Sequence, residues 1–379
     1  MARLVAATAD LAVAHPDVAV VASGLSYLQQ WLPHAGQALV RPKGAPVTRP
    51  AVALSMYPGL EAHALRPEHR AALAEVADVL EPTAVQALPA GRAAEVLGAA
   101  DVLLGHWGCM VVDGALLDRA PRLAMLAYAA GTLRDVVAPA AFARGLRITS
   151  GAAANAVPVA EYTVAAILWA NKGAFVERER LRGAELPPLP RRHPVGNWAK
   201  RIGLVGASHV GRAVVELLRP YRCSVVIADP YLSAEDAAAL GVERVELDEL
   251  LATSDVVSLH APALPSTERM IAGPELARMM DGATLVNTAR GVLVDHDALV
   301  REVGSGRLTA VLDVTDPEPL PPDHPLLHLP TCVVTPHLAG SQGSELSRQA
   351  ELVIEEIRRF AAGEPPLHPV VAADMDRVA

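Results

Sequence analysis

The stretch Ile202-Gly-Leu-Val-Gly-Ala-Ser-His-Val-Gly-Arg212 decides the fold of this chain. Its apolar start predicts a buried strand, and its glycine turn leads into an amphipathic helix expected over residues 212–219, before Pro220. A strand, a tight turn and a helix N-terminus together can hold a diphosphate, because outward N–H groups and the helix dipole attract negative charge. We therefore expect a dinucleotide at this turn.

The turn departs from the usual G-x-G-x-x-G fingerprint at one position, since it reads G-x-S-x-x-G. The Cβ of Ser208 should hold the phosphates slightly farther from the backbone, while its hydroxyl can donate a compensating hydrogen bond. The residues expected to contact the cofactor here are Gly206, Ser208, His209, Val210 and Gly211.

Bulk composition narrows the class of protein. The chain has 379 residues, enough for two domains, and a net charge of −9, which argues against a nucleic-acid partner. Its three cysteines are far apart, so we expect no disulfide, no metal site and a cytoplasmic location. No uncharged apolar run reaches about 18 residues and the N-terminus lacks a clean signal-peptide core, so no membrane partner is expected.

Strands alternate with helices along most of the chain, a pattern typical of α/β folds with parallel sheets. Pro158 suits the first turn of a long helix expected from residue 156. The expected strands are 51–56, 99–104, 123–128, 147–149, 202–205, 224–228, 256–259, 284–287, 310–314 and 332–335. The expected helices are 66–80, 114–119, 139–144, 156–172, 212–219, 234–240, 246–252, 273–280, 295–303 and 344–363.

Asp229 ends the second strand of the later half, 23 residues after Gly206. A carboxylate at this place can accept hydrogen bonds from an adenosine ribose and would repel a 2′-phosphate, so NAD is favoured over NADP. An aspartate before Pro230 could equally start a turn. The glycine loop at the right distance favours the cofactor role.

Polar residues follow four later strands, at the edge where open α/β sheets bind ligands. A lone histidine there is often structural, a lone arginine often caps a helix, and Glu318 stands between two prolines and could be turn chemistry. The four segments are Leu259–Thr267 with Ala261, Asn287–Gly291 with Thr288 and Arg290, Asp313–Pro319 with Glu318, and Thr335–Gly340 with His337.

Taken together, these segments resemble those of the D-isomer-specific 2-hydroxyacid dehydrogenases over roughly residues 50–370. The resemblance implies catalytic roles for Arg290, Glu318 and His337. It also implies cofactor contacts for Ala261, Thr288, Asp313 and Gly340, and a substrate-carboxylate loop at Gly131 and Thr132, with Leu133 where the family has a second glycine. Asn155 to Glu161 resembles the start of the family's interdomain helix.

The same resemblance implies two Rossmann-like α/β domains. We expect a flavodoxin-like, discontinuous substrate domain over residues 49–170 and 339–379 and an NAD-binding Rossmann domain over 171–338. Residues 1–48 form an extension, either a real one or translation from an upstream start. The family also implies a homodimer.

The residue types fit reduction of a 2-keto acid to a D-2-hydroxy acid with NADH. A histidine is a natural general acid near neutral pH, and a carboxylate bonded to it favours the protonated imidazole. An arginine fork pairs with a carboxylate. The alternative is an NAD(H)-sensing binding protein without turnover. Formate or phosphite oxidation is disfavoured, because formate dehydrogenases of the family carry glutamine in place of Glu318.

Overall fold

Alternating strands and helices build two β-sheets in the computed structural model, which describes residues 49–188 and 195–375. All of these residues belong to one unit, Thr48–Ala379. The extension expected over residues 1–48 and most of the loop expected at 186–194 lie outside the described ranges.

The first sheet has five strands in the order β2-β1-β3-β4-β5, and every pairing is parallel. This order is the flavodoxin-like one, so the predicted fold of this half is confirmed. The strands are β1 (Ala51–Ser55), β2 (Asp78–Val79), β3 (Val102–Gly105), β4 (Met125–Tyr128) and β5 (Arg147–Ser150).

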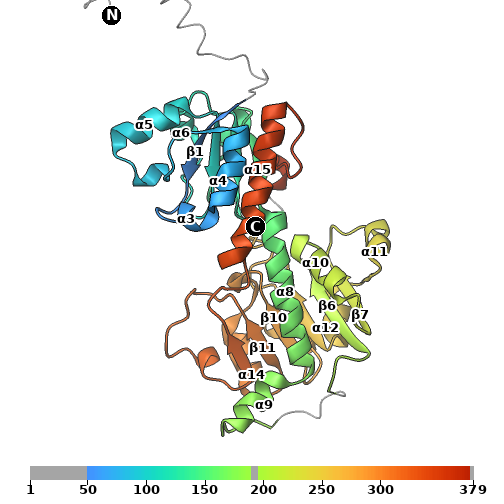
Figure 1. The fold of residues 1–379 in the computed structure, drawn as a ribbon. Helices are drawn as coiled ribbons and strands as arrows, with labels where there is room; N and C mark the ends of the chain where they lie inside the picture. Colours follow the sequence, from blue (N-terminus) through green and yellow to red (C-terminus); the bar gives the residue numbers. More distant parts are fainter. Residues whose placement is uncertain (1–48, 189–194, 376–379) are drawn as a thin grey trace, which may run out of the picture. The chain divides into compact units, whose positions relative to one another are not determined.

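Helices cover both faces of the first sheet because successive strand residues point to opposite sides. Leu54 packs on the face that α15 covers with Val353 and Ile357, whereas Leu103 packs on the other face. Figure 1 shows α15, from the C-terminal part of the chain, beside α4. The helices of this sheet are α3 (Glu61–Ala64), α4 (Pro67–Val76), α5 (Ala90–Ala99), α6 (Gly114–Arg119), α7 (Pro139–Ala143) and α15 (Leu346–Ala362).

The segment after α15 also joins the first sheet. Pro369 forms an antiparallel bridge with Thr149, and the Val370 N–H donates to the Ile148 carbonyl at 2.9 Å. Both ends of the described chain therefore belong to one sheet, which supports the discontinuous domain expected from the sequence.

The second sheet has seven parallel strands in the order β12-β11-β10-β9-β6-β7-β8. Strands β7 and β8 lie on one side of β6, and strands β9 to β12 lie on its other side. The strand order therefore reverses between β6 and β9. This is the Rossmann arrangement, and ligands bind where the order reverses. The strands are β6 (Lys200–Val205), β7 (Cys223–Ala228), β8 (Glu243–Arg244), β9 (Val256–Leu259), β10 (Thr284–Asn287), β11 (Thr309–Leu312) and β12 (Cys332–Val334).

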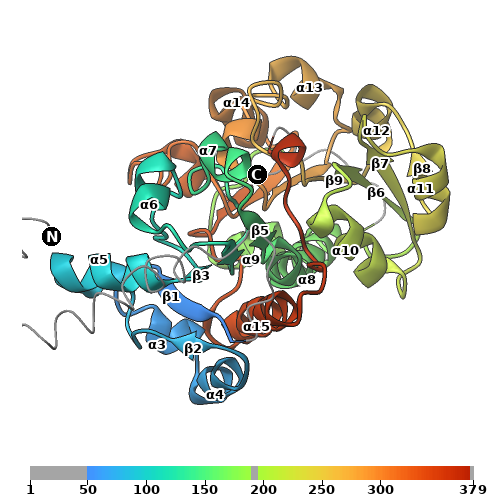
Figure 2. The same cartoon turned by 90° about the horizontal axis from the view of Figure 1, so that it is seen from above.

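Two apolar layers cover the second sheet. Leu204 and Val286 face the layer that contains α8 and α10, while Leu285 faces the layer of α12, α13 and α14. Figure 2 shows α10 next to α8. The remaining helices are α9 (Ala174–Leu181), α10 (His209–Leu218), α11 (Ala234–Leu240), α12 (Leu247–Thr253), α13 (Gly273–Arg278) and α14 (His296–Gly304). Short 3₁₀ turns span Val85–Ala87, Gly291–Leu293, Pro325–Leu327, Gly343–Glu345 and Ala372–Asp374.

Helix α8 (Ala152–Asn171) is long and apolar enough to cross a membrane by length and hydropathy. Half of that window is buried inside the protein, where Ile167 and its neighbours pack on the second sheet. The division of the chain at residue 170 stays a prediction. The packing of α8 favours placing the boundary before this helix, and we propose that position.

Some predicted bounds are wrong for identifiable reasons. Helix α8 begins at Ala152, so Pro158 lies inside it rather than in its first turn, because the preceding alanines are strong helix formers. Helix α10 begins at His209, not Arg212, because Ser208 caps it. Strand β3 begins only at Val102, since the alanine-rich residues before it form α5.

Candidate active site

The carboxyl ends of the parallel strands meet at one edge of the second sheet, so the residues that follow them lie in a row. The strand order determines the order of these residues along the edge. Along the edge the residues are Asp229 after β7, Gly206 after β6, His260 and Ala261 after β9, Thr288 after β10, Asp313 after β11 and Thr335 after β12.

Gly206 has a backbone that only glycine adopts easily, with φ of +106°. A Cβ atom here would come within 2.8 Å of the His260 carbonyl and 2.9 Å of the Ala261 nitrogen. A Cβ on Gly211 would come within 2.3 Å of the Gly206 carbonyl oxygen. The two glycines therefore allow the turn to press against β9, which creates the cradle that a diphosphate requires.

Ser208 is the N-cap of α10, and its hydroxyl oxygen accepts the Gly211 N–H at 3.4 Å. An accepting hydroxyl still keeps its own O–H, so it remains able to donate to a phosphate. The exposed His209 begins the helix beside it. Burial lowers the pKa of His209, and His368 and Arg212 lower it further.

Asp229 holds the turn through both of its carboxylate oxygens. Its Oδ2 accepts the Ala207 N–H at 2.7 Å, and its Oδ1 accepts the Tyr231 N–H at 2.7 Å. Each carboxylate oxygen has two lone pairs, so one on each remains for ribose hydroxyls. The two interpretations of this aspartate, turn former and ribose acceptor, are thus compatible.

His260 and Ala261 form the other wall of the Gly206 turn. His260 is buried, and its Nε2 lies 3.0 Å from Ser258 Oγ. Burial lowers the pKa of His260 to about 3, so this ring is neutral and structural. The contact predicted for the cofactor at Ala261 therefore rests on its backbone.

Thr288 is buried and bonded to helix α8. Its hydroxyl lies 2.8 Å from Thr163 Oγ1, which donates its own proton to the Val159 carbonyl at 2.7 Å. Thr288 must therefore donate to Thr163, because the Thr163 proton is already used. Only lone pairs and the backbone of Thr288 remain for a cofactor, and that contact stays a prediction.

Arg290 lies in a turn that Asn287 shapes. The Asn287 Nδ2 donates to the Arg290 carbonyl at 2.8 Å, and its Oδ1 accepts the Ala289 N–H at 3.1 Å. Arg290 Nη1 donates to the Ala289 carbonyl at 2.6 Å. Burial lowers the pKa of Arg290, and the negative charge of Glu318 opposes that effect. The remaining N–H groups of the guanidinium can bind a substrate oxyanion.

Glu318 and His337 form a direct pair, with Oε1 of the glutamate 2.6 Å from Nδ1 of the histidine. Both side chains are nearly half exposed, so a small molecule can reach them. A carboxylate can only accept, so Nδ1 carries the proton that it shares with Glu318. Nε2 of His337 is therefore the nitrogen left for chemistry.

Asp313 organises the loop that carries His337. The buried carboxylate accepts the Leu338 and Ala339 N–H groups, each at 2.9 Å, and the Thr335 hydroxyl at 2.6 Å. The His337 N–H donates to the Asp313 carbonyl at 2.8 Å. His337 has φ of +52°, a conformation unfavourable for a side chain with a Cβ, and these bonds hold it there. The cofactor contact expected at Asp313 stays a prediction.

Gly131 and Gly340 share a neighbour in Asn155. The Asn155 Nδ2 lies 3.9 Å from the Cβ position of Gly131 and 3.7 Å from that of Gly340. Leu133, where the family has a glycine, is buried in the first sheet's core. That Gly131, Thr132 and Arg290 meet one substrate stays a prediction.

Sequence reasoning missed the residues that support this row. Asn287 begins one of the four strand-end segments, and an asparagine at such a place is a recognisable signal for a turn that its side chain stabilises. Thr163 lies within an apolar helix and was not singled out. Tyr162 was also missed; its hydroxyl lies 2.7 Å from Thr335 Oγ1. Nothing local marks a threonine or tyrosine within a helix as a partner of a distant loop.

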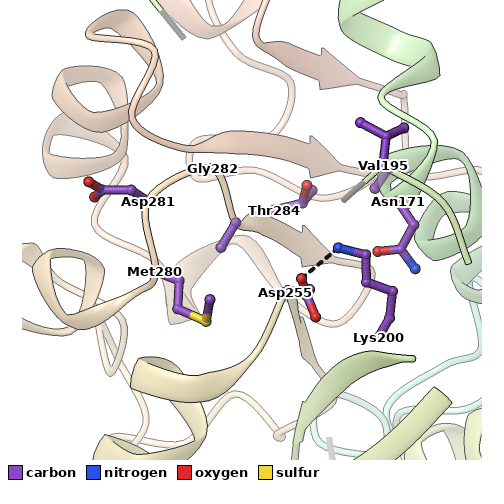
Figure 3. Close-up of a pocket in the computed structure, with 10 residues that line it drawn as sticks. Asn171, Val195, Lys200, Asp255, Met280, Asp281, Gly282 and Thr284 are labelled. Carbon is purple, nitrogen blue, oxygen red and sulfur yellow. Dashed lines mark hydrogen bonds and ion pairs between the residues drawn. The ribbon is translucent and has the colours of Figure 1, made fainter. Parts of the chain in front are cut away.

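A small pocket with an empty volume of about 360 Å³ lies at the opposite edge of the second sheet (Figure 3). Lys200 Nζ and Asp255 Oδ1 pair across it at 2.7 Å, at the amino ends of β6 and β9. It is therefore separate from the row of strand ends. In residues 49–188 and 195–375, no group of three His, Cys, Asp or Glu side chains could hold a metal ion.

Comparison with known proteins identifies the family of this chain. Residues 165–339 match the family model of the D-isomer specific 2-hydroxyacid dehydrogenase NAD-binding domain. A D-3-phosphoglycerate dehydrogenase of Mycobacterium tuberculosis is 35% identical over 276 residues, which cover 70% of this chain and 50% of that protein. This chain thus spans about half the length of that relative.

Two further relatives are matched over most of their own length. A glyoxylate reductase of Korarchaeum cryptofilum is 32% identical over 261 residues, 67% of this chain and 78% of the enzyme. The crystal structure of the TT0316 protein from Thermus thermophilus is 31% identical, with a TM-score of 0.64 over 85% of this chain and 100% of that one.

Proposed function

This chain belongs to the D-isomer-specific 2-hydroxyacid dehydrogenase family, and from that premise we propose that it reduces a 2-keto acid to a D-2-hydroxy acid with NADH. The observation that supports this most directly is the 2.6 Å pair of Glu318 and His337 at the strand-end edge of an NAD-binding domain. This pair supplies a positioned proton donor beside the cofactor edge.

The residues of the cofactor edge fit NAD. The turn at Gly206 has no room for a Cβ, α10 presents its N-terminus there, and Asp229 keeps lone pairs for a ribose. NADH, when bound, supplies the hydride that reduces the keto carbon. The carboxylate of Asp229 would repel a 2′-phosphate, which favours NADH over NADPH.

The remaining side chains bind the substrate and exchange a proton with it. Arg290, fixed by its bond to the Ala289 carbonyl, pairs with the substrate carboxylate and polarises the keto group. Nε2 of His337 gives its proton to the keto oxygen as the carbon is reduced, and takes a proton back in the reverse reaction. Glu318 holds the imidazole and stabilises its positive charge.

The named relatives favour an enzyme over an NAD(H)-sensing binding protein, because both are named as oxidoreductases. The substrate itself is a proposal at the level of a 2-keto acid. We also propose a homodimer, as the family resemblance implies, and a cytoplasmic location, which the free thiols of Cys109, Cys223 and Cys332 favour. Light scattering after size exclusion would test the dimer.

The test is a panel of 2-keto acids, including glyoxylate and hydroxypyruvate, mixed with protein and NADH or NADPH. We expect loss of absorbance at 340 nm with NADH and at least one acid, and slower loss with NADPH. NADH binding without turnover of any acid would contradict the proposed reaction and favour the binding protein.

A further inference from the structure

A cluster of polar groups lies where the end of β3 meets the starts of α8 and α15. His106 and Gln349 are almost fully buried, at 1% and 0% exposure. His106 Nε2 and Gln349 Oε1 are both buried without a hydrogen-bond partner within bonding distance in the described part of the chain. The reaction proposed above uses neither residue, so their retention in the interior needs another reason.

Backbone N–H groups fix the direction of this cluster at both ends, because they can only donate. The Trp107 N–H donates to His106 Nδ1 at 2.8 Å, so Nδ1 is the unprotonated nitrogen of the ring. Burial lowers the pKa of His106 to about 4, and the neutral ring therefore carries its proton on Nε2. At the other end, the Ser341 N–H donates to Asn155 Oδ1 at 3.0 Å.

Gln349 connects the two ends. Its Nε2 donates to Asn155 Oδ1 at 3.3 Å, which is the only orientation possible because that oxygen is an acceptor. Its Oε1 is left as the acceptor. Gln349 raises the pKa of His106, against the larger effect of burial, although no hydrogen bond of normal length joins the two side chains. The unpartnered donor of His106 and the unpartnered acceptor of Gln349 are therefore complementary.

This polarity determines where Asn155 directs its own donors. With Oδ1 held by Ser341 and Gln349, the Nδ2 group lies 3.9 Å from the Cβ position of Gly131. The Cβ position of Gly340 is near both amide atoms, 3.5 Å from Oδ1 and 3.7 Å from Nδ2. Gly131 begins the segment expected to hold the substrate carboxylate, and Gly340 follows His337 by three residues. The N–H groups of Asn155 thus lie beside the segment expected to hold the substrate carboxylate.

We propose that His106 and Gln349 are positioning residues, which orient the Asn155 amide so that its N–H groups bind the carboxylate of the substrate. The proposal rests on the proposed function, since it names a carboxylate ligand of the same site. A buried polar pair lowers the stability of the fold compared with apolar side chains. A hydrogen-bond donor that is already fixed in place offsets this, because less conformational entropy is lost when the anion binds.

Two variants remove the polar groups of this cluster without opening a large cavity, His106→Phe and Gln349→Met. We expect each to raise KM for glyoxylate and hydroxypyruvate about tenfold, the effect of one lost hydrogen bond to a charged group. We expect kcat to change less than about twofold and NADH affinity, measured by fluorescence, to stay the same. The matched control is His69→Phe, another buried histidine of the first sheet's helices, for which KM should stay unchanged.

A conservative variant separates positioning from stability. His106→Gln places an amide N–H near the position of imidazole Nε2 and should bring KM within about threefold of the wild type, whereas His106→Asn is too short to do so. A purely structural role predicts lower Tm in all of these variants with no separation in KM. Wild-type KM in His106→Phe would overturn the proposal and leave the proposed function intact.

The proposal is also testable if no 2-keto acid is turned over, a result that would reject the proposed function by itself. The side-chain amide signal of Asn155 in ¹⁵N NMR, identified by its loss in Asn155→Ala, reports its hydrogen bonds directly. Both His106→Phe and Gln349→Met should shift this signal and His69→Phe should not. An unshifted signal in the first two variants would overturn the proposed positioning.

Discussion

Glu318 Oε1 lies 2.6 Å from His337 Nδ1, which leaves Nε2 as the nitrogen of His337 that can exchange a proton with a substrate. The pair joins two segments 19 residues apart, one after β11 and one after β12. They lie close together because β11 and β12 are neighbouring parallel strands. The carboxylate of Asp313 fixes the loop between β12 and α15 by accepting hydrogen bonds from its backbone.

His337→Ala should abolish reduction of 2-keto acids and leave NADH affinity nearly intact. The reason is that the proposed mechanism assigns the proton to the ring of His337 and cofactor binding to the Gly206 turn and Asp229. Steady-state turnover and NADH fluorescence titration measure the two effects separately. Loss of NADH binding together with turnover would show that the histidine has another role.

Glu318→Gln should lower kcat by roughly tenfold to a hundredfold, because a hydrogen bond to a charged group contributes about 1.5–3 kcal/mol. Glutamine keeps an acceptor for Nδ1–H but removes the negative charge that stabilises the protonated ring. The decrease should be larger for kcat than for NADH affinity. An unchanged kcat would mean that the carboxylate only shapes the turn between its two prolines.

Ser208 can be tested with a pair of variants. Ser208→Ala removes the N-cap of α10 and should cost about 1 kcal/mol of unfolding free energy, whereas Ser208→Gly should cost only a few tenths. If the hydroxyl donates to a phosphate, both variants weaken NADH binding. Tighter NADH binding in Ser208→Gly would instead show that the Cβ holds the diphosphate away from the turn.

Asp229→Asn should reduce the preference for NADH over NADPH, measured as the ratio of their kcat/KM values. The change removes the negative charge that repels a 2′-phosphate. It also leaves one carbonyl oxygen for two backbone donors, Ala207 and Tyr231, so overall affinity for both cofactors should fall. An unchanged ratio would assign Asp229 to the turn alone.

Acid should destabilise the fold through its buried histidines. Burial lowers the pKa of His106 to about 4 and that of His260 to about 3, from an ordinary value of 6.5. Below pH 6.5 the unfolded chain binds protons that these folded residues do not, so the free energy of unfolding falls as pH falls, down to about pH 4 and pH 3 respectively.

The expected loss is roughly 2 kcal/mol for each histidine between pH 7 and pH 5. Urea denaturation at both pH values measures it. His106→Gln, which cannot titrate, should remove the His106 share and leave the rest. The same pH dependence in wild type and His106→Gln would show that His106 does not contribute.

The α/β architecture could be predicted from the sequence because hydrophobic periodicity and the residues that end helices and strands depend on local interactions. Strands such as Val256–Leu259 and helices such as Ala234–Leu240 were predicted with their observed bounds, since turn and cap residues flank them. Errors arose where alanine-rich segments fit several structures, as at the starts of α8 and β3. Ala90–Ala99 was not predicted as a helix for a similar reason, and the charged helix Ala174–Leu181 was missed as well.

The side chains proposed as catalytic were predicted from the sequence, but the residues that support them were not. His337 and Glu318 occur in recognisable segments, and the structure brings them together. The bond between Thr288 and Thr163 joins residues 125 positions apart, and the contact between Gln349 and Asn155 joins residues 194 apart. Such contacts depend on tertiary packing that no local pattern encodes.

The left-handed backbone of His337 is stabilised from inside the second sheet, by the carboxylate of Asp313 rather than by the substrate side. The proposed acid–base pair is consequently supported by bonds within the second sheet. Substitutions in the loop after β4, at residues 132–138, could alter which keto acid is accepted without disturbing that support, whereas the loop after β3 begins with His106, on which the proposed orientation of Asn155 depends. Redesign of substrate range in this scaffold would begin at the loop after β4.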